Sequence, residues 1–132
     1  GWSAAGGGWP AGSEGVLAGL AAGTGVAALW PWTQLYQVEA DRARSERTLA
    51  DWLGVRGTLA WTAHGLALTA WSLAALGQPI PAGIAAAGAG GSLTTAVTAP
   101  SGWSPSHRTT MIGLYAFSTA FLVWTVATWG AA

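Results

Sequence analysis

The chain contains no cysteine and no lysine, and charged residues make up only 8% of its 132 positions. Without cysteine, the sequence excludes a disulfide framework, a thiol nucleophile and a cysteine-bound zinc site. Five arginines are balanced by five acidic residues, so the formal net charge is zero. Such a chain has neither the basic surface of a nucleic-acid-binding protein nor a polybasic lipid-binding patch, and we expect no nucleic acid partner.

The chain is instead rich in apolar residues, which make up 52% of it. Four apolar stretches have roughly the 20-residue length that crosses a bilayer as a helix. They cover residues 15–36, 57–77, 80–99 and 109–130. The runs lack the alternation of barrel strands, and only helices or closed barrels satisfy the backbone in lipid. We therefore expect an all-α membrane protein, a bundle of four transmembrane helices. The alternative is a very apolar soluble helical bundle.

The positions of the arginines predict the orientation of this bundle. Four arginines lie between the first and second spans, and Arg108 lies between the third and fourth. Loops rich in positive charge stay in the cytoplasm. Both basic loops then fall on one side of the membrane, so we expect both termini outside the cytoplasm. Residues 1–14 are expected to form a flexible or processed segment, and residues 15–132 the transmembrane domain.

The polar loop from Trp32 to Leu49 and the residues just after it hold almost every charge in the chain. A polar segment kept between membrane spans usually has a function. Pro31, just before the loop, is expected to bend or end the first helix. Residues 45–53 are expected to form a short cytoplasmic cap helix, because its apolar residues share one face and Gly54 can end it.

The loop combines carboxylates, an amide and arginines. Carboxylate and amide oxygens suit Mg²⁺, which usually binds one or two carboxylates and leaves its other positions to water and phosphate. We therefore predict Glu39 and Asp41 as metal ligands, with Gln37 beside them. Guanidinium groups pair with phosphate oxygens, so Arg42 and Arg47 are predicted to bind a diphosphate. The alternative is that the loop only solvates the surface and sets the topology.

His64 lies near the middle of the second apolar stretch. An intramembrane histidine can bind haem or the magnesium of a chlorin, so His64 is a candidate pigment or haem ligand. The alternative is a core histidine that is hydrogen-bonded to a threonine or to a backbone carbonyl.

Residues 31–54 resemble the second conserved region of the UbiA-type membrane prenyltransferases. Many members read close to Pro-x-Thr-Gln-x-Tyr-Gln-x-Glu-Glu-Asp, followed by Gly-Asp-Arg-Thr-Leu-Ala and Leu-Gly. This chain reads Pro-Trp-Thr-Gln-Leu-Tyr-Gln-Val-Glu-Ala-Asp over 31–41, Arg-Thr-Leu-Ala over 47–50 and Leu-Gly over 53–54. The resemblance implies a fold similar to the last four of the nine helices in that family.

The same resemblance implies transfer of an isoprenoid from a diphosphate donor, with Mg²⁺ holding the diphosphate between two acidic motifs. The second motif would fall on Gln37, Glu39 and Asp41, and the diphosphate would be bound by Tyr36, Gln37, Arg42 and Arg47. The implied partners are the lipid bilayer, a polyprenyl diphosphate or other lipid-like molecule, and other membrane protein chains.

This sequence departs from the family pattern at three points. The first Asp-rich motif is absent, since the chain's aspartates are Asp41 and Asp51. Ala40 stands where a second acid is usual, and Ser-Glu replaces Gly-Asp at 45–46. One acidic cluster cannot stabilise a leaving diphosphate as two would. We therefore expect this chain to be inactive as a prenyltransferase on its own.

Three hypotheses follow from these observations. The chain is half of a UbiA-like prenyltransferase, active when a partner supplies the first Asp-rich motif. Alternatively, it is a non-catalytic accessory or structural subunit of a larger membrane complex and contacts pigment or lipid. In the third hypothesis it is an unrelated pigment- or haem-binding membrane protein that uses His64.

Overall fold

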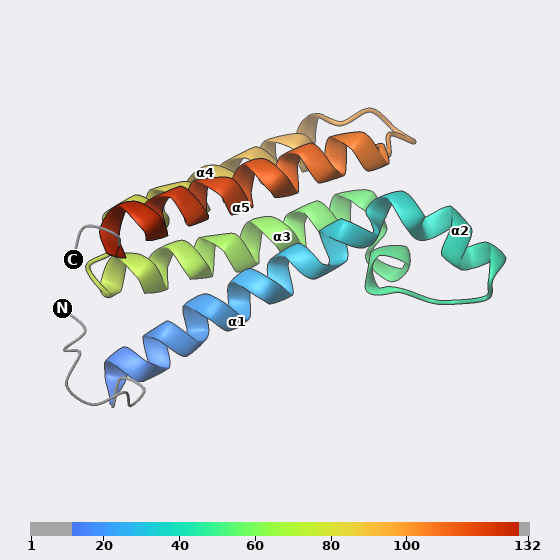
Figure 1. Ribbon diagram of the computed structural model, residues 1–132. Helices are drawn as coiled ribbons and strands as arrows, with labels where there is room; N and C mark the ends of the chain where they lie inside the picture. Colours follow the sequence, from blue (N-terminus) through green and yellow to red (C-terminus); the bar gives the residue numbers. More distant parts are fainter. Residues whose placement is uncertain (1–11, 130–132) are drawn as a thin grey trace.

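The computed structural model describes residues 12–129. Helices and the turns between them make up this part of the chain, and it contains no strand. Four long helices lie side by side, and a short helix projects from one end of the molecule (Figure 1). The elements are α1 (Ser13–Gln34), a 3₁₀ turn η1 (Leu35–Gln37), α2 (Val38–Ala43), α3 (Leu49–Ala75), α4 (Pro79–Thr98) and α5 (His107–Trp129). The predicted all-α fold is confirmed. Most of the predicted N-terminal segment, 1–14, lies outside the described residues.

Two helical stretches are long and apolar enough to cross a membrane. They are Ser13–Ala43, which joins α1 to α2, and Pro79–Thr98, which is α4. Helices α3 and α5 are not among them, and both contain several Thr and Trp residues and a His. Length and composition therefore identify two of the four predicted spans.

Small residues bring α1 and α3 into close contact. A Cβ atom added at Gly65 would lie 2.6 Å from the Cβ of Ala28 and 3.0 Å from the carbonyl oxygen of Thr24. One turn further along, the hydroxyls of Thr24 and Thr69 lie 2.8 Å apart. Small side chains allow this close approach, and the threonines add hydrogen bonds between the helices.

Pro31 lies inside α1 without ending it. A proline has no N–H, so the carbonyl four residues earlier, that of Ala27, loses its helical donor. The indole Nε1 of Trp61 on α3 donates to this carbonyl at 2.9 Å. Thr62 donates from its hydroxyl to the next carbonyl, that of Ala28, also at 2.9 Å. Helix α1 therefore continues to Gln34, beyond the expected break, because α3 supplies the missing donor.

Helices α4 and α5 complete the bundle. Arg56 on α3 donates to the carbonyl of Ala99, at the end of α4, at 2.9 Å. In the middle of α4, a Cβ added at Gly88 would lie 3.0 Å from Leu66 and 3.2 Å from Phe117 of α5. Near its start, α5 meets α1, where a Cβ at Gly113 would lie 2.6 Å from the Trp32 ring.

Large apolar side chains are exposed on the outside of all four long helices. An exposed apolar surface of this extent marks a membrane or protein interface. The exposed residues include Val16, Leu20, Val26 and Trp30 on α1, Leu68 and Trp71 on α3, Ile80, Leu93 and Val97 on α4, and Ile112, Leu122, Val123 and Val126 on α5.

We expect Gly65→Ala to destabilise the bundle and Gly83→Ala to leave it intact. The new methyl group at position 65 overlaps Ala28 and forces α1 and α3 apart, which costs about 1–3 kcal/mol. At Gly83 a Cβ meets nothing within 4 Å, and alanine in a helix is favoured by about 0.5–1 kcal/mol. Thermal unfolding in detergent micelles measures both. Equal melting temperatures for the two variants would contradict the close contact.

A pair of threonines on α3 provides a second test. Thr58 and Thr62 are both fully buried, but only Thr62 has a hydrogen-bond partner among the described residues. We expect Thr62→Val to lower stability by about 0.5–1.5 kcal/mol, because the bond to Ala28 is lost. Thr58→Val should leave stability unchanged or raise it. Thermal unfolding curves of the two variants measure the difference. A larger loss of stability in Thr58→Val than in Thr62→Val would show that the Thr58 hydroxyl is hydrogen-bonded.

Candidate functional site: a polar cap on an apolar bundle

Residues 35–54 form a folded unit, here called the polar cap, between α1 and the long part of α3. After η1 and α2 the chain reverses at Ser45, which has a φ of 60°. Thr48 then caps the start of α3 by accepting from the backbone N–H of Asp51 at 3.2 Å. Gly54, with φ 66° and ψ 175°, interrupts the helix after its first turns. The predicted cap helix therefore starts at Leu49 rather than Ser45, because Thr48 provides the N-cap, and it ends at Gly54 as predicted.

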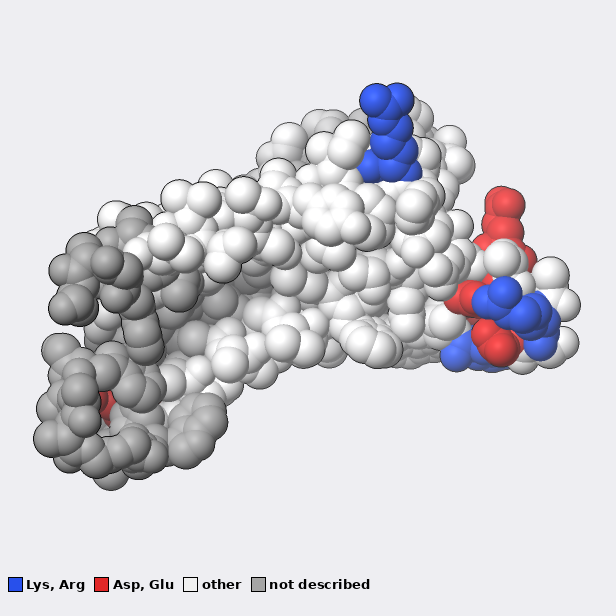
Figure 2. Space-filling model, viewed as in Figure 1, with Lys and Arg blue, Asp and Glu red and all other residues white. Residues whose placement is uncertain are grey.

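Ion pairs connect the parts of the cap. Arg44 pairs with Asp41 and, at 3.4 Å, with Glu46. Arg42 on α2 reaches Asp51 on α3, with 2.6 Å between Nε and Oδ1. Figure 2 shows these charges gathered at one end of the molecule, with uncharged surface over most of the described bundle. The cap is thus a small polar unit, held by ion pairs, on an apolar body.

Asp41 is the centre of this unit. The residue is only 3% exposed, in contrast to its partner Arg44, which lies at the surface. Its backbone carbonyl accepts from the N–H of Glu46 at 2.9 Å and from that of Arg44 at 3.1 Å. Side chain and backbone of one residue therefore both hold the 43–46 turn. A buried carboxylate needs such partners, because an unpaired buried charge is costly.

Tyr36 and Gln37 form a second cluster at the base of the cap. The Gln37 amide donates to the Tyr36 hydroxyl at 2.6 Å. The Tyr36 ring meets the ring of His107, at the start of α5, edge to face, with 4.6 Å between centroids. Tyr36 and Gln37 are half-buried, whereas His107 is exposed. This contact brings the beginning of α5 to the side of the cap.

The structure brings only some of the predicted phosphate-binding residues together. Tyr36 and Gln37 are in direct contact. Arg42 and Arg47 are both exposed, Arg42 in its pair with Asp51. Arg47 forms no ion pair with any residue between 12 and 129. It is therefore the cap arginine that an external anion can reach without displacing an acid.

The two predicted metal ligands lie in different surroundings. Glu39 is exposed, whereas Asp41 is buried and paired with Arg44. Within the part of the chain that the structure describes, no three His, Asp or Glu side chains cluster as a metal site would. Two carboxylates still suit Mg²⁺, which takes its remaining ligands from water and phosphate. The metal role of Glu39 and Asp41 stays a prediction.

His64 is exposed on the surface of α3. Among the described residues His64 has no hydrogen-bond partner, and the nearby Thr62 and Thr69 donate to backbone carbonyls. A pigment or haem bound by His64 would therefore sit on the outside of this bundle. That role also stays a prediction.

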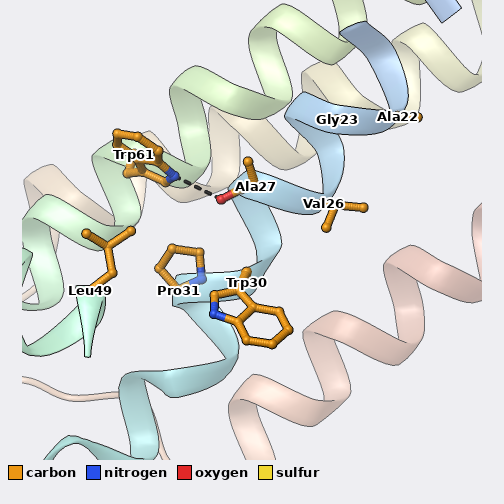
Figure 3. A pocket seen from close by; sticks show the side chains of 8 residues that line it. All are labelled: Ala22, Gly23, Val26, Ala27, Trp30, Pro31, Leu49 and Trp61. Atoms are coloured by element: carbon orange, nitrogen blue, oxygen red, sulfur yellow. Dashed lines mark hydrogen bonds between the residues drawn. The ribbon is translucent and has the colours of Figure 1, made fainter. Parts of the chain in front are cut away.

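An open apolar groove of about 600 Å³ runs along α1 and α3 (Figure 3). Its cap end is formed by Leu49, Pro31 and the indoles of Trp30 and Trp61, and the Trp61–Ala27 hydrogen bond closes its wall. Gln34 follows Trp30 by one turn, and its Oε1 is buried without a hydrogen-bond partner among the described residues. The remaining lining residues are Ala22, Gly23, Val26 and Ala27.

Sequence reasoning missed this groove and the pairing of acids with arginines. One signal for the groove was present, because a proline at 31 leaves the carbonyl at 27 in need of a donor. The pairing of Arg42 with Asp51 had no such signal. It depends on where the chain returns after the 43–46 turn.

No protein family, curated protein or solved structure matches this chain.

We expect Asp41→Asn to loosen the cap much more than Asp51→Asn does. Both arginine partners are exposed, but the Asp41 side chain is 5% exposed and that of Asp51 16%. A hydrogen bond to a buried charged group contributes about 1.5–3 kcal/mol, whereas a more accessible ion pair contributes about 0–1 kcal/mol. Hydrogen exchange of residues 38–48 measures the difference. Equal protection in the two variants would contradict the central place of Asp41.

Proposed function

We propose that this chain is a membrane-embedded module of a UbiA-like prenyltransferase and binds the diphosphate of a polyprenyl donor at the polar cap. One observation carries the proposal. An acid-and-arginine unit, built around buried Asp41, sits on the end of an otherwise apolar helical bundle. The motif that resembles the family, residues 31–54, spans this unit. We therefore place the proposed binding site in the polar cap, where most of the charged residues lie.

In this proposal all four long helices cross the bilayer. Their exposed apolar side chains support it, together with the two stretches that pass by length and hydropathy. The cap and the connection between α4 and α5 lie at the same end of the bundle in Figure 1. All five arginines belong to these two regions or to their borders. This end would face the cytoplasm, with both termini on the other side.

The residues of the cap suit a diphosphate with Mg²⁺. Arg47 is the exposed first contact for phosphate, and Arg42 lies in the same cap. A diphosphate that draws Arg44 away would leave the Asp41 carboxylate free to bind a cation, and Glu39, two residues away on α2, would have to turn toward it. Bound Mg²⁺ would neutralise charge on the departing diphosphate. Tyr36 and Gln37 supply hydrogen-bonding groups at the base of the cap.

Catalysis in this proposal needs acidic groups from outside these 132 residues. The two aspartates, Asp41 and Asp51, both lie in the cap and both have arginine partners. A second acidic cluster must therefore come from other polypeptide, such as a partner membrane chain. The exposed apolar face of α5 is available for such a helical partner.

A second candidate is a non-catalytic accessory subunit of a membrane complex. The observation in its favour is that arginines already neutralise Asp41 and Asp51. A cap of this kind can serve as an ordered structural unit without any metal. The two candidates differ in whether the cap binds a prenyl diphosphate.

The deciding experiment measures binding of geranylgeranyl diphosphate to the purified chain in nanodiscs, with and without MgCl₂. We expect binding that depends on Mg²⁺ and falls at least tenfold in Asp41→Asn and in Arg47→Gln. Glu14→Gln, at the opposite end of α1, is the control and should bind as the unmodified chain does. Absence of Mg²⁺-dependent binding would overturn the prenyltransferase proposal and leave the accessory subunit.

A further inference from the structure

We infer that the groove between α1 and α3 holds one acyl chain of an anionic bilayer phospholipid, whose phosphate pairs with Arg47. The inference rests on the membrane placement proposed above. It does not depend on prenyl transfer, because the groove and the acids of the cap are separate features.

The wall of the groove is suited to a hydrocarbon chain. Every lining residue is apolar or glycine except for the indole nitrogens, and the Trp61 nitrogen is already bonded to Ala27. The carbonyl that Pro31 leaves free is thus not exposed as an unpaired acceptor. A volume of about 600 Å³ falls within the range of about 300–1,000 Å³ typical of small-molecule sites.

The depth of the groove comes from small residues on α1. Gly23 and its neighbours Ala22 and Ala27 line the stretch beyond the indoles of Trp30 and Trp61. A Cβ atom added at Gly23 would meet nothing within 4 Å. A larger side chain there would therefore leave the backbone without a clash at its Cβ and extend into the groove. The groove can thus be blocked while the fold is kept.

The charged end of the groove determines the class of lipid. Leu49 forms this end, and Arg47 lies two residues before it. The other nearby arginines, Arg42 and Arg44, have acidic partners, but Arg47 pairs with no acid in the described chain. A guanidinium without an acidic partner, on the segment that leads to the end of the groove, complements an anionic headgroup.

The test is native mass spectrometry of the chain released from vesicles of equal parts phosphatidylglycerol and phosphatidylcholine. We expect one retained phosphatidylglycerol per chain. Gly23→Phe should reduce that retention at least fivefold. Gly19→Phe is the matched control, because it places the same ring on α1 in open space outside the groove. Equal retention by the two variants would overturn the site.

A second pair of variants tests the headgroup contact. Arg47→Gln should remove the preference for phosphatidylglycerol over phosphatidylcholine, whereas Arg108→Gln, another exposed arginine, should keep it. An unchanged preference in Arg47→Gln would overturn the phosphate contact. Recovery of each variant in the membrane fraction is checked first. Absence of the unmodified chain from that fraction would refute the membrane placement. Loss of lipid in Gly23→Phe alone is a different result and concerns only the groove.

Discussion

The contact between α1 and α3 is the constraint on which the other features depend. Gly65 lets the backbones meet at Ala28, and hydrogen bonds from α3 side chains follow the contact along α1. In a bilayer, close packing and interhelical hydrogen bonds stabilise helix pairs, because lipid tails offer no hydrophobic driving force between them. This contact would therefore stabilise the fold even in lipid.

Both candidate sites follow from that contact. Because α1 is held against α3 past Pro31, the end of α1 and the start of α3 emerge side by side. The 43–46 turn then closes the gap, and Arg42 reaches Asp51. On the outside of the same helix pair, Trp61 bonds the Ala27 carbonyl and becomes the wall of the groove. One helix interface thus positions a polar cap and an apolar groove next to each other.

The pairing inside the cap bears directly on function. Arginines neutralise Asp41 and Asp51, so the cap is stable without a ligand. A diphosphate and Mg²⁺ would have to exchange partners with these residues, with phosphate taking the arginines and the cation taking the acids. The same pairing suits a structural unit with no ligand. The two proposed functions therefore share the fold. They differ in whether phosphate and a cation replace the ion pairs within the cap.

The sequence alone predicted the helices, because its long apolar runs lack the alternation of strands. It also predicted the polar loop and the end of the cap helix at Gly54, since these depend on neighbouring residues. Tertiary structure decided that Arg42 meets Asp51, that His64 faces outward, and that Trp61 closes a groove. Those features depend on the register between α1 and α3, which is set by contacts between residues more than 30 positions apart.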